Sequence, residues 1–131
     1  MIEVKVTSVG IDEEAGTSEP GLAETAPCLE AIPGLPSQAS QRLLQVLAAE
    51  PAVRQVWLYG SRAMGRQRQG SDIDLTLVGE ELNGETLLGL MQTIDDLMLP
   101  WSVDLSLHAR LDAEVRNHVE RIGRLLRLPG R

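Results

Sequence analysis

Apolar residues recur along this chain at two spacings, and the spacings predict its secondary structure. Alternation of apolar and polar residues indicates a half-buried strand, whereas spacings of three and four indicate a helix with one buried face. Alternation and β-branched or aromatic content predict three strands, at residues 53–59, 71–78 and 101–107.

Helical spacing begins after Ser37, where Ser37 or Ser40 is expected to cap the open N–H groups, and the segment ends at Pro51. A second helix is expected to follow Asn83 and to close at Pro100. The polar segment between the first two strands, residues 61–70, can form a short helix.

The last helix is expected to start at Asp112, which can cap it. We expect it to continue to residue 126, because one face carries the apolar residues Val115, Val119, Ile122 and Leu126. His118 lies beside this face, and we interpret it as structural or as part of an interface. The predicted order is α-β-(α)-β-α-β-α, without an internal repeat.

Residues 1–37 differ in composition from the rest of the chain. Ile2, Val4 and Val6 alternate with polar residues and suit a short strand, but the following residues are rich in Gly, Pro, Ser, Thr and Glu. Such a composition buries too little apolar surface to offset chain entropy. We therefore expect an acidic, flexible N-terminal extension over residues 1–37 and one domain over residues 38–131.

The formal net charge is −7, and residues 1–37 hold −6 of it. A chain of this charge has no basic surface for binding a nucleic-acid polymer, and its two Trp and one Tyr offer few platforms for base stacking. It has no apolar run of about 18 residues, no basic and apolar leader, and a single cysteine, so we expect a cytoplasmic protein without membrane contact, internal disulfide or zinc cluster.

Carboxylates occupy the polar faces of two predicted strands. Asp72 and Asp74 share one face of strand 71–78, and Asp104 lies on the polar face of strand 101–107. If these strands are neighbours, the three side chains converge. Crowded carboxylates are stable when they share a proton or bind a cation, and their hard oxygen atoms suit Mg²⁺, one or a pair of ions. The alternative is that they line a solvated sheet face.

A glycine and a serine follow the first strand, and ten residues separate the serine from the first aspartate. Gly60 lets backbone N–H groups approach a phosphate closely, and the Ser61 hydroxyl adds a donor. Arg62, Arg66 and Arg68 add positive charge that a triphosphate needs. Taken alone, this segment could be an ordinary turn and a solvated loop; its place between the two strands favours phosphate binding.

These motifs, at residues 58–65, 70–75 and 103–105, resemble those of the minimal nucleotidyltransferases of the DNA polymerase beta superfamily. The resemblance covers about residues 40–126. It implies an α/β (α+β) fold, a small mixed sheet of three strands in the order 1-2-3 with helices packed on it. It also implies Mg²⁺-dependent transfer of a nucleoside monophosphate from ATP or another NTP to a hydroxyl, with release of pyrophosphate.

The resemblance also assigns roles to residues. Gly60 and Ser61 would hold the β- and γ-phosphates, and the expected nucleotide-binding residues are Gly60, Ser61, Arg62 and Ser71. The expected metal ligands and catalytic carboxylates are Asp72, Asp74 and Asp104. Among them, Asp104 would also help to deprotonate the acceptor hydroxyl.

Minimal members of this family lack a domain for the acceptor. They resemble the antitoxin half of pairs in which AMP is placed on a tyrosine of a helical HEPN-type toxin. We therefore expect a HEPN-type protein or a second subunit to complete the acceptor site. Two alternatives stay open: a small-molecule acceptor such as an antibiotic, and a binding antitoxin without catalysis.

Overall fold

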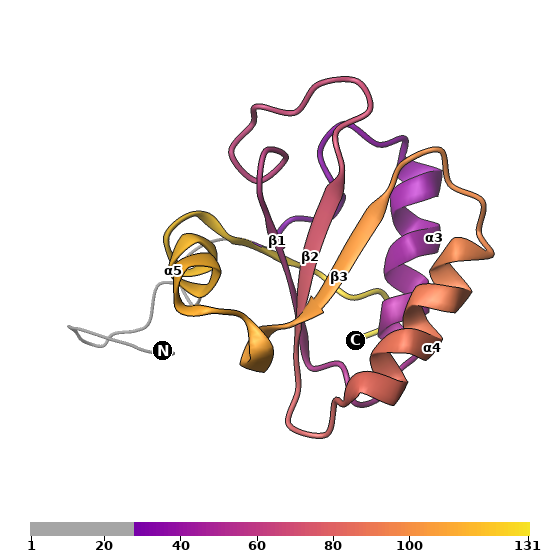
Figure 1. The fold of residues 1–131 in the computed structure, drawn as a ribbon. Helices are drawn as coiled ribbons and strands as arrows, with labels where there is room; N and C mark the ends of the chain where they lie inside the picture. The colour runs from indigo at the N-terminus through magenta and orange to yellow at the C-terminus, as the bar shows by residue number, and fades with distance from the viewer. Residues whose placement is uncertain (1–27) are drawn as a thin grey trace.

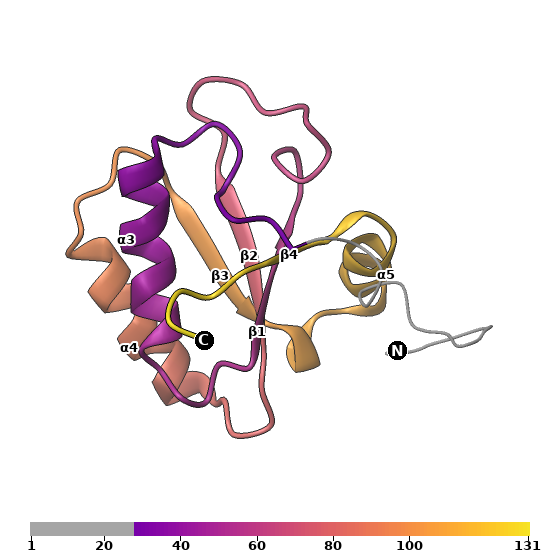
Figure 2. The ribbon, with the colours of Figure 1, turned by 180° about the vertical axis from the view of Figure 1, so that it is seen from behind.

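The structure is a computed structural model that describes residues 28–131; the strand expected around Ile2, Val4 and Val6 lies outside the described residues. A mixed sheet forms the centre, with two helices on one face and one on the other (Figures 1 and 2). In chain order the elements are α3 (Ser37–Ala48), β1 (Gln55–Tyr59), β2 (Ile73–Val78), α4 (Gly84–Asp95), β3 (Val103–Leu107), the 3₁₀ turn η1 (His108–Arg110), α5 (Ala113–Ile122) and β4 (Arg124–Leu126).

The sheet has four strands in the order β3-β2-β1-β4. Strand β1 runs antiparallel to β2 and β4, whereas β2 and β3 are parallel and are joined through α4. The three expected strands are therefore present in the expected order 1-2-3. The expectation of three strands is corrected to four, because β4 is added beside β1.

Strand β4 replaces the end of the last predicted helix. Helix α5 is capped by Asp112 as expected, since the Asp112 side chain accepts a hydrogen bond from the Val115 N–H at 2.9 Å. The helix ends at Ile122, and Gly123 turns the chain into β4. Leu126 thus reaches the core from a strand, although its spacing of four from Ile122 also fits a helix.

The core lies between the sheet and the pair α3 and α4, which cover its apolar face (Figure 1). Alternation along each strand sends every second residue to this side. The fully buried apolar strand residues on this side are Val56, Leu58, Ile73, Leu75 and Leu77, and α3 adds Leu43, Leu44 and Leu47. The opposite face of the sheet carries the polar strand residues and is partly covered by α5 (Figure 2).

Residues 28–36 pack onto the domain, although they fall within the extension expected to be flexible. Leu29 forms a parallel bridge with Leu126 and exchanges backbone hydrogen bonds with the β4 region. Ile32 is buried in the core, and its N–H donates to the Ser40 hydroxyl at 2.8 Å. Ser40 therefore binds the preceding segment, and neither it nor Ser37 caps α3, which begins after Pro36 without a side-chain cap.

Two other helix predictions need correction. Residues 61–70 form successive turns and no helix. Helix α4 begins at its Asn83 cap, as expected, but ends at Asp95, well before Pro100. Met98 follows in the left-handed region, with φ of 56°. None of the helices in residues 28–131 is long and apolar enough to cross a membrane.

Candidate active site

The polar face of the sheet brings two of the expected carboxylates together. Asp74 of β2 is paired in register with Asp104 of the parallel strand β3, and Tyr59 of β1 is paired with Asp74 on the other side. Residues in register on neighbouring strands point to the same face. Tyr59, Asp74 and Asp104 therefore form a row across three strands, at the end of the sheet where the loop from β1 to β2 begins (Figure 1).

The surroundings of this row raise the pKa of Asp74. Partial burial is the main cause, and the negative charges of Asp104 and Asp72 add to it, while the positive charge of Arg62 acts in the opposite direction. Asp72 itself is exposed, at the residue before β2 begins. The expected convergence of three carboxylates is thus reduced to the pair Asp74 and Asp104, which lie in register. Asp72 lies at the solvent side, where its charge still reaches Asp74.

The same row affects Tyr59. Burial raises the pKa of its phenol, and the charges of Asp104 and Asp74 raise it further, although the Ser106 hydroxyl partly offsets them. The phenol therefore keeps its proton at neutral pH and can act as a donor beside two carboxylates. The sequence pattern places Tyr59 only as the end of a strand and predicts no role for it in the site.

Gly60 begins the loop directly against Asp74. Its φ is +77°, in the left-handed region, and a Cβ built on it would lie 2.3 Å from the Asp74 carboxylate oxygen. No side chain can occupy that space without moving the carboxylate. The expected need for glycine at this position is therefore explained by contact with the carboxylate as well as by backbone conformation.

Arg62 lies beneath the loop and is only 2% exposed. Its guanidinium donates to three backbone carbonyls: Pro33 O at 2.7 Å, Ser71 O at 2.7 Å and Asp72 O at 3.3 Å. Burial lowers the pKa of Arg62, and the charges of Asp72 and Asp74 counteract that shift. This placement does not suit the expected direct contact with a nucleotide, because the donors are directed at the protein backbone.

Ser71 closes the other end of the loop. Its hydroxyl accepts the Arg68 N–H at 2.8 Å, and the Ser71 N–H donates to the Arg68 carbonyl at 2.9 Å. The loop start is held in the same way, since the Arg66 N–H donates to Ser61 O at 2.8 Å. Arg66 and Arg68 are exposed. They are the cationic side chains of the loop that a ligand can reach.

His118 belongs to this site, which sequence reasoning missed. It lies on α5, and its Nε2 accepts the Gly60 N–H at 3.4 Å. Its ring meets the Tyr59 ring edge to face, with centroids 6.2 Å apart and an interplanar angle of 78°. The helical spacing placed His118 beside the apolar face of α5, but only the packing of α5 on β1 brings it to Gly60.

The carboxylates suit a hard cation. Mg²⁺ is usually held by one or two protein carboxylates, water and the phosphates of a substrate. Asp74 and Asp104 match that set, and the raised pKa of Asp74 reflects a repulsion that a cation relieves. In the part of the chain that the structure describes, no three His, Cys, Asp or Glu side chains are gathered closely enough to hold a metal ion by themselves.

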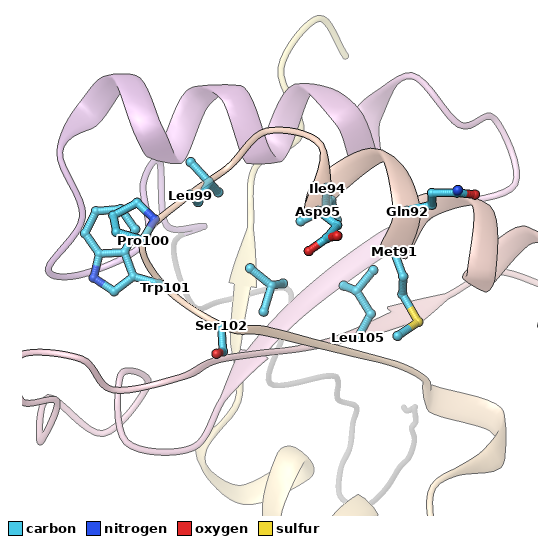
Figure 3. A pocket seen from close by; sticks show the side chains of 10 residues that line it. Met91, Gln92, Ile94, Asp95, Leu99, Pro100, Trp101, Ser102 and Leu105 are labelled. Atoms are coloured by element: carbon cyan, nitrogen blue, oxygen red, sulfur yellow. The ribbon is translucent and has the colours of Figure 1, made fainter.

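A separate groove of about 570 Å³ lies on the face of β3 that is opposite to Asp104 (Figure 3). It runs between the C-terminal half of α4 and the edge strand, and its walls include Met91, Ile94, Trp101 and Leu105. Alternation along β3 turns Leu105 toward this groove and Asp104 away from it. The groove and the carboxylate row are therefore on opposite faces of the sheet.

The fold and the carboxylate row define a nucleotidyltransferase-type domain, and comparison with known families agrees. Residues 41–127 match the family described as polymerase beta, nucleotidyltransferase, so this chain belongs to that family. The chain is 32% identical over 68 residues to a probable protein adenylyltransferase, MntA, of Haemophilus influenzae. That match covers 51% of this chain and 60% of the relative.

Solved structures share the fold. A toxin-antitoxin structure with AMP-PNP has a TM-score of 0.56 and 23% identity, covering 73% of this chain and 76% of the solved chain. A structure of the toxin-antitoxin pair MntA-HepT has a TM-score of 0.53 and 18% identity, covering 70% of this chain and 72% of that one. These likenesses confirm the predicted polymerase beta type of fold.

Proposed function

We propose that this chain is a Mg²⁺-dependent nucleotidyltransferase that transfers AMP from ATP to a hydroxyl of a partner protein. The acceptor we infer is a tyrosine of a HEPN-type toxin, so that the chain acts as an antitoxin. One observation carries the proposal: Asp74 and Asp104 face each other in register, directly beside the tight glycine turn at Gly60.

The triphosphate would bind at the start of the loop. Its proposed ligands are the backbone N–H groups at Gly60 and the Ser61 hydroxyl. The exposed side chains of Arg66 and Arg68 supply positive charge near them. Arg62 acts as a positioning residue, because its three hydrogen bonds tie the loop to the segment before α3 and to the start of β2.

Asp74, Asp104 and the exposed Asp72 would hold Mg²⁺, which neutralises charge on the triphosphate and on the leaving pyrophosphate. The acceptor oxygen attacks the α-phosphorus, and the bond from that phosphorus to the bridging oxygen breaks. Pyrophosphate leaves with the electron pair. The hydroxyl proton passes to the Asp104 carboxylate and then to solvent, as general-base catalysis requires.

A protein acceptor is supported by the relatives. The Haemophilus influenzae relative is named a probable protein adenylyltransferase, and solved structures of similar fold are toxin-antitoxin pairs. The described residues also contain no second domain that could enclose an acceptor. A partner or a second subunit would complete the site above the exposed Asp104.

Intact mass spectrometry tests the proposal. The chain is incubated with its candidate toxin, ATP and Mg²⁺, and the toxin is expected to gain the mass of one or more AMP units. The variants Asp74→Asn and Asp104→Asn should abolish the gain, while Asp96→Asn, an exposed aspartate at the end of α4, should leave it unchanged.

The two alternatives give other results. A small-molecule acceptor is indicated if the toxin gains no mass but an antibiotic does. A binding antitoxin is indicated if Asp74→Asn and Asp104→Asn still protect cells from the toxin. Transfer at the wild-type rate by either variant contradicts the proposed site.

A further inference from the structure

The N–H group at the start of the candidate phosphate loop already has a partner within the protein. The Gly60 N–H donates to His118 Nε2 at 3.4 Å, across a sequence separation of 58 residues. A backbone amide has one N–H, so it cannot also serve a phosphate oxygen at full strength. A bond of 3.4 Å is long for N–H···O or N–H···N geometry and is readily exchanged.

The imidazole is held in place from two sides. Helix α5 carries it at the middle of a helix whose start is capped by Asp112, and the Tyr59 ring meets it edge to face. The Gly60 backbone lies between this ring and the Asp74 carboxylate, which a Cβ on Gly60 would approach to 2.3 Å. His118 is therefore an ordered component of the carboxylate site and not a solvated helix residue.

We propose that His118 Nε2 binds the Gly60 N–H of the nucleotide site in place of a phosphate oxygen, until a nucleotide replaces it. This inference rests on the proposed function. An acceptor at Nε2 requires the neutral tautomer with its proton on Nδ1. Hydrogen bonds to an ionised phosphate are shorter and stronger than those to a neutral acceptor, so the exchange favours the nucleotide.

The proposed exchange predicts the sign of the change in nucleotide affinity when His118 is substituted. Breaking the bond to His118 opposes nucleotide binding, so removing the acceptor should tighten binding by about 2- to 10-fold, the effect of one net hydrogen bond. A residue that merely supports the loop would do the opposite, because its loss would weaken binding.

Three substitutions separate these cases. His118→Ala removes the acceptor. His118→Asn places an amide oxygen near the position of Nδ1, too short to reach Gly60, whereas His118→Gln can place one near the position of Nε2. We expect His118→Ala and His118→Asn to bind more tightly than the wild type, and His118→Gln to restore wild-type affinity.

The probe is an ATP analogue with a methylene group between the α- and β-phosphorus atoms, with Mg²⁺, measured by calorimetry on the full chain. Equal or weaker binding by both His118→Ala and His118→Asn overturns the inference. Thermal unfolding of each variant shows whether the variant folds. If a variant does not fold, a second measurement on the wild-type chain tests the inference without any substitution.

That measurement is ¹⁵N NMR of the unsubstituted chain. On adding the analogue, the Gly60 amide and the His118 Nε2 resonance should both shift. If the Gly60 and Ser61 amides shift while His118 Nε2 does not, the inference about His118 fails and the nucleotide site stands. If neither the loop amides nor His118 respond, the proposed function itself is contradicted.

Discussion

Gly60 offers a sharp test of how the loop and the carboxylates depend on each other. Gly60→Ala introduces two effects: a non-glycine residue at φ +77° and a Cβ that would lie 2.3 Å from the Asp74 carboxylate oxygen. Gly65 provides a matched control, because its φ is +71° and a Cβ there would meet no atom within 4 Å. Gly65→Ala therefore carries the backbone strain without the steric conflict.

The strain can be estimated from the backbone alone. A residue with a Cβ costs about 1–2 kcal/mol in the left-handed region. Both variants should therefore lose about that much free energy of unfolding, which lowers Tm by about 4–16 °C in a domain of this size. Gly60→Ala must also move the carboxylate of Asp74 away from the space that the Cβ takes, so its site geometry changes and that of Gly65→Ala does not.

Two assays separate the effects. Thermal unfolding should give both variants a reduced Tm. AMP transfer measured by intact mass should fall by about 100-fold only in Gly60→Ala, because a misplacement of about 1 Å in an active site costs about that much in rate. An independent readout is the pKa of Asp74 followed by ¹³C NMR, since a displaced carboxylate loses part of the burial and repulsion that raise it. Equal transfer rates in the two variants, with an unchanged pKa of Asp74, would refute the reasoning.

Three further outcomes follow from the described contacts. Burial and neighbouring carboxylates raise the pKa of Asp74 above its unfolded value of about 3.9, so the folded state binds the proton more tightly and stability falls as pH rises through the folded pKa. Asp74→Asn should therefore unfold at a higher denaturant concentration than the wild type at pH 7, lose this advantage below pH 4, and lack stabilisation by Mg²⁺. In urea titrations, Arg62→Ala should lower the free energy of unfolding by about 3 kcal/mol or more, because it leaves three carbonyls without their charged donor. The control Arg66→Ala, at an exposed arginine, should change the free energy of unfolding by less than about 0.5 kcal/mol. Met98→Gly should raise the urea midpoint by the equivalent of about 0.5–1 kcal/mol, since Met98 has φ of 56° and is 84% exposed; an unchanged midpoint would mean that the left-handed residue carries no strain.

The pairing of Asp74 with Asp104 was predictable because it depends on the alternation of residues within each strand. Alternation places Asp72 and Asp74 on one face of the predicted strand 71–78, and the same rule places Asp104 on the corresponding face of β3. Once β2 and β3 are neighbours, their parallel register brings Asp74 opposite Asp104. The alternation therefore predicts the pair Asp74 and Asp104. The exposure of Asp72 depends instead on the residue at which β2 begins.

Strand β4 was not predictable by the same rule. A three-residue strand is too short to show alternation, and the spacing of Val115, Val119, Ile122 and Leu126 is typical of one helical face. Gly123 ends the helix: a Cβ on it would lie 2.4 Å from the Val119 carbonyl oxygen, which accepts the Gly123 N–H at 2.7 Å. A glycine is a weak stop signal in sequence, and the partner that selects the strand, β1, is distant in the chain.

The roles of Arg62 and His118 depend on contacts with residues that are far away in the sequence. Such roles cannot be assigned from the sequence, whereas the positions of the carboxylates can. Arg62 reads as a phosphate-binding cation because it follows Gly60 and Ser61, but Pro33, 29 residues earlier, takes one of its donors at 2.7 Å. Together with the buried Ile32 and the bridge from Leu29 to Leu126, that contact holds residues 28–36 on the domain, although their composition predicts an extension. The segment contributes a carbonyl that holds the buried Arg62, and Arg62 in turn ties the candidate phosphate loop to the strand that carries Asp74. The carboxylates therefore depend on the register of the sheet, and the loop beside them depends on a segment whose sequence gives no sign of it.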